Sequence, residues 1–278
     1  MKNIKKIIPI LLFGFLSISC SRNEENPENP DVNDPLVTKM SANVFYPGSM
    51  SYNQSVLNFS FEYNSSQRLT KKIGGFLPVS GSTGLSGFFT DKIYTSLIYT
   101  NNNVTVENFS SSTDFTVPKN TKYYTLNSLN QIVSKEIPNT SNYWLKKQTF
   151  TYLDNKLIDI KTTLPNMPYD PTDPNDYIMT YLEKFYYDAN GNLIKSEYFE
   201  QQNGINKGEK IVRTFEDYDN STNPTKRLQL LDDFFYRSIS KNNFRKYTEI
   251  HYNNDVLTST NITTWTFNYN SNGQITIN

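Results

Sequence analysis

The chain of 278 residues carries 27 basic and 27 acidic side chains, with a single His and a single Cys. The balanced charge argues against a protein that binds mainly nucleic acid, and one His and one Cys exclude intrachain disulfides, His-rich or Cys-ligated zinc sites and iron–sulfur clusters. Without disulfides or such metal sites, a core must form by ordinary burial, and the length allows one large domain or two small ones. The aromatic content of 14% favours β-strands.

Residues 1–19 have the parts of a secretory signal peptide. Three lysines among the first six residues form a basic head, an apolar stretch follows at 7–16, and small residues precede Cys20. The apolar stretch is shorter than the roughly 20 residues that a membrane-spanning helix needs. Loss of the signal removes three of the 27 basic groups, so the mature chain has 24 basic against 27 acidic groups and a net charge of −3.

The lone cysteine falls at the expected cleavage point. Leu16 to Cys20 reads Leu-Ser-Ile-Ser-Cys, which resembles the lipobox of bacterial lipoproteins. That resemblance implies that Cys20 is acylated and becomes the mature N-terminus. An anchor of two or more acyl chains would make membrane attachment stable, because a single chain binds only marginally. The alternative is ordinary cleavage nearby, in which Cys20 has no special role.

Residues 20–35 form the lipidated cysteine and a leash that is predicted to be disordered and acidic. After Cys20 the leash has no aromatic residue and one aliphatic residue, too little apolar surface to offset the chain entropy lost on folding. Glu24 and Glu25 resemble the surface-export signal of Bacteroidota-type lipoproteins. This implies a lipid-anchored protein of the outer membrane that faces outward, with the periplasmic leaflet as the alternative.

Residues 36–278 are predicted to form a single β-repeat domain. Its repeated unit is an aromatic strand with period-two spacing, a turn that begins with Asp or Asn, and an aliphatic strand, as in a β-hairpin. The clearest copies are 185–195 and 265–277, and degenerate copies occur at 59–69, 124–132, 150–157 and 250–257.

Each clear copy predicts a three-residue hairpin loop with a left-handed residue at its end. The turn-defining residues are Asp188 and Gly191 in one copy and Asn270 and Gly273 in the other. The predicted cross-strand pairs are Tyr187 with Leu193 and Tyr269 with Ile275.

The motif Tyr187-Asp188-x-x-Gly191-x-Leu193 is similar to the tyrosine–aspartate repeat of Rhs-type shell proteins. The layout as a whole resembles Bacteroidota lipoproteins that carry an uncharacterised β-repeat domain described as porin-like. Together with the strand pattern, the resemblance implies an all-β fold: an antiparallel meander of repeated hairpins that curls into an open or closed barrel-like sheet.

One short helix is predicted near residues 226–240. The apolar residues Leu228, Leu231, Phe235 and Ile239 have helical spacing there, and a proline precedes them. The helix is expected to close an edge or an end of the sheet, and an irregular crossover between strands is the alternative.

The long connections are the predicted recognition surface. If neighbouring strands pair in order, the Asp and Asn turns lie at one end of the sheet and the long connections form a rim at the other end. Loops on a rigid scaffold often carry binding residues. The predicted rim consists of 78–91, 110–121, 165–176 and 203–208.

Few residues suggest chemistry. His251 shares a strand face with Glu249, so the two side chains form a possible acid–base pair, or the imidazole lies on the solvated side of a strand. Asp170, Asp173 and Asp176 are weak candidates for Ca²⁺ ligands, with a solvated turn as the alternative. Neither a nucleophile elbow nor a phosphate-binding loop accompanies them.

Trp144 and Trp265 are expected in the core, with stacking on a sugar ring as the alternative. The sequence therefore predicts a non-catalytic, lipid-anchored envelope protein without a cofactor. Its expected partners are the membrane and a glycan or other extracellular ligand. The alternative is a structural or assembly component of the outer envelope that contacts another protein.

Overall fold

The computed structural model describes residues 36–45, 57–81, 84–140 and 144–276. The predicted signal peptide, Cys20 and the leash lie outside the described residues. One antiparallel sheet contains fourteen strands in strict chain order, and β15 and β16 form a separate hairpin. The sheet is an open meander, because its first and last strands do not pair. The predicted all-β meander is confirmed.

The strands of the sheet are β1 (Lys39–Ser41), β2 (Asn58–Tyr63), β3 (Leu69–Gly81), β4 (Gly84–Thr100), β5 (Asn103–Ser110), β6 (Lys122–Leu126), β7 (Ile132–Ile137), β8 (Lys146–Leu153), β9 (Lys156–Thr163), β10 (Met179–Tyr187), β11 (Leu193–Gln202), β12 (Ile205–Tyr218), β13 (Phe244–Asn253) and β14 (Val256–Thr264). The small hairpin is β15 (Asn268–Tyr269) and β16 (Ile275–Thr276). The helical elements are α1 (Ala42–Phe45), the 3₁₀ turns η1 (Lys226–Leu228) and η2 (Asp232–Phe234), and α2 (Phe235–Ser238).

Four turns share one geometry. In each, an Asp or Asn side chain accepts hydrogen bonds from the backbone amides two and four residues ahead, and the residue three ahead is left-handed. The first residues of the four turns are Asn64, Asn127, Asp188 and Asn270. The left-handed residues are Gln67 at 57°, Asn130 at 58°, Gly191 at 86° and Gly273 at 72° in φ. The predicted pairs Tyr187 with Leu193 and Tyr269 with Ile275 are both present.

The predicted rim is partly wrong. Residues 78–81 belong to β3 and residues 84–91 to β4, because this Gly/Ser-rich stretch pairs through its backbone instead of looping out. Residues 203–208 are a tight turn followed by the start of β12. Loops remain at 111–121 and 164–178, opposite most of the Asp and Asn turns. The turn at Asn254 and Asp255 lies at the loop end, because a long connection already joins β12 to β13 at the other end.

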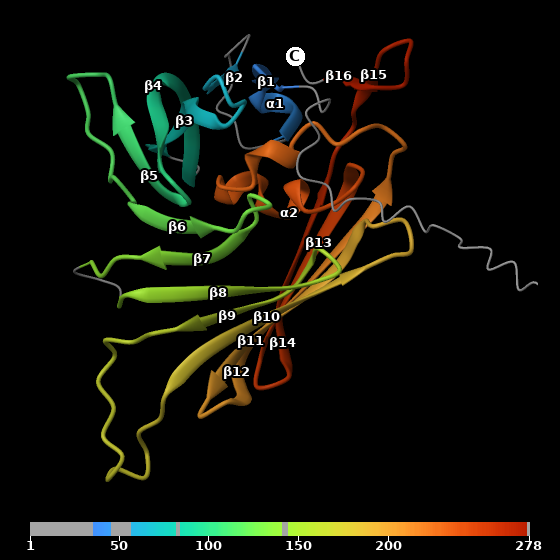
Figure 1. Cartoon of the computed structure of the whole chain (residues 1–278). Coiled ribbons are helices and arrows are strands. Elements are labelled where there is room, and N and C mark those ends of the chain that lie inside the picture. Colours follow the sequence, from blue (N-terminus) through green and yellow to red (C-terminus); the bar gives the residue numbers. More distant parts are fainter. Residues whose placement is uncertain (1–35, 46–56, 82–83, 141–143, 277–278) are drawn as a thin grey trace, which may run out of the picture.

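That connection, residues 219–243, is the inserted segment. Figure 1 shows its short helical turns within the curve of the sheet. The predicted helical structure near 226–240 is confirmed, but it is divided into η1, η2 and α2. The two 3₁₀ turns change the spacing of the buried positions from that of an α-helix. Leu230 and Phe234 are therefore buried together with the predicted Leu228 and Leu231.

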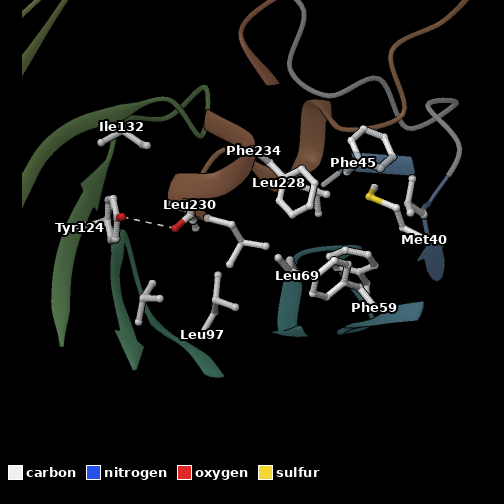
Figure 2. Close-up of a cluster of buried hydrophobic side chains, with 14 of the residues drawn as sticks. Met40, Phe45, Phe59, Leu69, Leu97, Tyr124, Ile132, Leu228, Leu230 and Phe234 are labelled. Carbon is white, nitrogen blue, oxygen red and sulfur yellow. Dashed lines mark hydrogen bonds between the residues drawn. The ribbon is translucent and has the colours of Figure 1, made fainter. Parts of the chain in front are cut away.

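The apolar side of the inserted segment packs on the concave face of the sheet. Leu228 and Phe234 are 0% and 1% exposed, and they lie in one cluster with Phe59 from β2 and Leu97 from β4 (Figure 2). The hydroxyl of Tyr124 on β6 donates a hydrogen bond to the carbonyl of Leu230 at 3.3 Å. The segment therefore supplies the second layer that a single sheet needs to bury one of its faces.

Charged side chains hold the same segment to several strands. Asp232 accepts hydrogen bonds from Lys122 on β6 and from Lys135 on β7, the latter at 2.8 Å. Lys72 on β3 donates to Asp233 at 3.1 Å. Desolvation alone would raise the pKa of Asp232, but the nearby charges of Lys135 and Lys122 lower it to about 2.

Within the described ranges no helix is long and apolar enough to cross a membrane.

Replacing Gly191 by Ala should lower the free energy of unfolding by about 1 kcal/mol, because an L side chain is strained at φ 86°. The reverse change at the equivalent position, Gln67→Gly, should raise it by a similar amount, since Gln67 already occupies the left-handed region. Urea titrations of the two variants measure both effects. If both substitutions raised, or both lowered, the free energy of unfolding, the shared turn geometry would be contradicted.

Replacing Asp232 by Asn should cost about 1 kcal/mol at pH 7, a small value because half of the carboxylate side chain is exposed. The folded-state pKa of Asp232 lies below its ordinary value, so its contribution is present above about pH 4 and is lost as the pH falls towards about 2. Unfolding titrations from pH 7 to pH 2 should show the difference between wild type and variant shrinking.

The control for this titration is Asp91→Asn. Asp91 is 70% exposed and lies 3.7 Å from the adjacent Lys92, so its loss should leave stability unchanged across the same range. A stability difference for Asp232→Asn that stays constant down to pH 2 would exclude the ion pairs as its cause.

Candidate functional site

A pocket of about 310 Å³ lies where the curled sheet fails to close. Its walls come from α1, from the inserted segment and from the last three strands of the sheet. They consist of Phe45, Phe215, Asp233, Phe234, Tyr236, Arg237, Phe244, Tyr247, Thr263 and Trp265. This volume is at the lower end of the range for small-molecule sites, and the aromatic lining with a few polar groups is typical of them.

Side chains bridge the opening of the sheet beside this pocket. The indole Nε1 of Trp265, just after β14, donates a hydrogen bond to the backbone carbonyl of Phe45 in α1 at 3.1 Å. The Phe45 ring in turn lies 5.9 Å from the ring of Phe234 and 5.9 Å from that of Phe267, between ring centroids. The two ends of the meander therefore meet through aromatic packing, and the space left between them is the pocket.

Arg237 forms the cationic wall of the pocket. Its guanidinium carbon lies 4.0 Å from the ring centroid of Phe244 and 4.3 Å from that of Trp265, and its Nη1 donates to the carbonyl of Phe244 at 3.0 Å. The residue is 6% exposed, and aromatic faces and a backbone oxygen contribute to stabilising its charge. The pocket lining thus contains one cation, Arg237, and one carboxylate, Asp233.

A second group of side chains, here called the polar row, continues along the concave face: Glu183, Arg213, Glu249 and His251. Arg213 donates to Glu249 at 2.9 Å and to Glu183 at 3.2 Å. His251 Nε2 lies 2.8 Å from Glu249 Oε1, so the predicted sharing of one face is confirmed. That face is the concave one, since register pairs Arg213 with Glu249 and the buried Phe215 with Tyr247.

The pocket and the polar row are connected through two tyrosines. Tyr236 and Tyr247 line the pocket with their rings, while their hydroxyls donate to Glu183 and to Glu249. Burial raises the pKa of both tyrosines, so each hydroxyl stays protonated and acts as a donor. The two features form one continuous surface beside the inserted segment.

The carboxylates of the polar row are well supplied with donors. Glu183 accepts from Ser196, Arg213 and Tyr236, and Glu249 contacts Arg213, Tyr247 and His251. Burial would raise the pKa of Glu249, but these hydrogen bonds and the charge of Arg213 lower it. Glu249 therefore stays ionised and is a weak base, suited to holding its neighbours in place and to accepting polar groups of a ligand.

The three aspartates proposed for Ca²⁺ lie in the exposed loop 164–178. Asp176 accepts from the amide of Asp170 at 2.7 Å, and Asp170 accepts from Thr172 at 2.9 Å. Asp173 accepts from the amide of Asn175 at 2.8 Å. These oxygens bond to the loop's own backbone, and among the described residues no group of three His, Cys, Asp or Glu side chains is placed to hold a metal ion.

The two tryptophans differ. Trp265 is half-buried against the core, as expected. Trp144 is 44% exposed in the connection between β7 and β8, so its predicted core position is wrong. It lies outside the period-two run of β8, which begins at Lys146, and therefore no pleat directs it inward.

Three residues of the site, Trp265, Glu249 and His251, were named from the sequence, and the others were not. Arg213 is on the same strand face as Phe215, and that spacing was the available signal for a charged group on the concave side. No signal joined Phe45 to Trp265, because their contact depends on the curvature of the whole sheet.

The solved structures that resemble this chain include two porin-like proteins. One is a porin-like protein from Bacteroides uniformis, with a TM-score of 0.43 and 15% identity over 79% of each chain. The other is a porin-like protein from Bacteroides vulgatus, with a TM-score of 0.48 and 9% identity over 87% of this chain and 90% of that one. No protein-family model matches the sequence, and no curated protein matches it. The fold of this chain follows from its own strand pairing.

Proposed function

We propose that this chain is a lipid-anchored protein of the outer membrane, displayed at the cell surface by an acylated Cys20 and the leash 20–35. Its folded domain is non-catalytic and binds a glycan or another extracellular ligand. The observation that carries the binding role is the pocket of about 310 Å³, where aromatic rings converge with a carboxylate and a hydroxyl.

The lining suits a carbohydrate in particular. The rings of Tyr236, Tyr247 and Trp265 offer apolar faces for the C–H side of a sugar ring. The Asp233 side chain is 52% exposed and Thr263 is half-buried, so both offer polar atoms for sugar hydroxyls.

The polar row supports a binding role over a catalytic one. A general base works best with a pKa near the operating pH, whereas the pKa of Glu249 is lowered and its oxygens are engaged by Arg213 and Tyr247. Such a network holds the surface beside the pocket in one arrangement, which lowers the entropy lost when a ligand binds.

A structural or assembly role in the envelope is the second candidate. Its specific support is β14, a strand of nine residues at the edge of the sheet. An exposed edge strand is a ready template for pairing with another chain. The two roles use different surfaces and are compatible in one molecule.

Binding is tested on an array of neutral and acidic oligosaccharides, with the full chain carrying Cys20→Ala. Thr263→Phe fills the pocket and should lower the affinity for glycan at least tenfold. Thr264→Phe, on the opposite face of the same strand, is the matched control and should bind normally.

The loop end of the sheet is tested on the same array with Trp144→Ala and Tyr169→Ala, which remove exposed aromatic side chains there. Both should bind normally. Loss of binding in these variants, with Thr263→Phe unaffected, would move the site from the pocket to the loops.

Anchoring is tested by replacing Cys20 with Ala in cells fed labelled palmitate. The label and the membrane association should both be lost, because two acyl chains are what make attachment stable. Protease added to intact cells should degrade the wild-type domain. Full protection of the domain, with the label intact, would place it on the periplasmic side.

A further inference from the structure

The last strand of the sheet has one open side. β14 (Val256–Thr264) pairs with β13 along one side, and no strand that the structure describes pairs with its other side. The opposite edge strand of the sheet, β1, has only three residues. The exposed backbone of the sheet is therefore concentrated along β14.

Side-chain exposure marks the same strand. Every residue of β14 is exposed apart from Thr263, which is half-buried. Its three large apolar side chains are Val256, Leu257 and Ile262, which are 67%, 58% and 62% exposed. An edge of this length and apolar content is expected to be covered by something.

The composition of β14 is unusual for an edge. It is the one strand of the fourteen in the sheet that has no charged residue, and it contains no Pro or Gly. Edge strands usually carry Lys, Pro or a twist that prevents pairing with other chains. Their absence here favours an edge that pairs.

The hydrogen-bond pattern shows which residues face outward. The amide of Trp265 donates to the carbonyl of Arg245 at 2.8 Å, which makes that opposed pair a bonded one. Bonded and non-bonded pairs alternate along an antiparallel ladder, and the register continues from Lys246 with Thr264. Between Trp265 and the β-bulge opposite His251, the even-numbered residues Thr260, Ile262 and Thr264 therefore direct their amides and carbonyls to the open side. The bulge at Thr258 ends this alternation.

We propose that β14 pairs antiparallel with β14 of a second copy of this chain, about a two-fold axis at Ile262. This register pairs the regular part of the strand, residues 260–264, and places Thr260 opposite Thr264. It also sets even residues opposite even residues, as the outward amides require. The inference goes beyond the proposed function and does not depend on a ligand in the pocket.

A second copy fits this edge better than a different protein does. Two uncharged strands meet without repulsion, and a two-fold axis makes one patch complementary to itself. A different partner is usually selected by complementary charge at the interface, and β14 offers none. The paired edges would join two fourteen-stranded sheets into one.

The register is tested with single cysteines in the full chain carrying Cys20→Ala, where the introduced thiol is the sole cysteine. Ile262→Cys should form an intermolecular disulfide on mild oxidation, since the Cα atoms of a bonded antiparallel pair lie about 5.5 Å apart, within disulfide range. Thr260→Cys and Thr264→Cys should each fail alone and should crosslink when the two chains are mixed.

The dimer itself is tested by light scattering on the same Cys20→Ala background. Thr260→Pro removes an outward amide and leaves the β13–β14 bonds intact, so the measured mass should fall by half while the circular dichroism spectrum of the folded chain is retained. Thr260→Val keeps the amide and should stay dimeric. A monomeric parent chain, a dimeric Thr260→Pro chain, or a crosslink through Thr260→Cys alone would overturn the proposal.

Discussion

Burial of the inserted segment against the concave face is the interaction on which the rest of the structure depends. A single sheet, however long, needs a second layer to bury its apolar side. Residues 219–243 provide it, with Leu228 and Phe234 almost fully enclosed and Asp232 held by lysines of β6 and β7. Without this segment the rings of Phe59 and Phe215 would face water, so the repeated hairpins do not make independent units.

The position of the candidate site follows from how far that segment reaches. It enters between β12 and β13 and covers one part of the concave face, and the remaining part carries the charged side chains of Glu183, Arg213 and Glu249. Tyr236 belongs to the segment and bonds to Glu183, so it marks the boundary between the packed core and the polar row. A ligand site at such a boundary has apolar rings on one side and hydrogen-bonding groups on the other.

Local features of the fold were predictable, because they depend on residues a few positions apart. The turn at Asp188 and the pairing of Tyr187 with Leu193 follow from hairpin stereochemistry alone. The strand path of residues 78–81 and 84–91 was not predictable, since a Gly/Ser-rich stretch has no side-chain pattern and takes its structure from the partner strand. The candidate site was missed for a related reason, because it joins Phe45 to Trp265 across the full circuit of the sheet.

The pocket and the open edge have one cause. Closing the sheet would require β1 to pair with β14, but β1 has three residues and β14 has nine, so most of β14 would stay unmatched. Aromatic packing of Phe45 with Trp265 and Phe267 fills the gap near one end instead. That packing leaves a pocket beside the rings and an uncharged strand beyond them. A longer first strand would complete the ladder, and it would remove the pocket and the edge together.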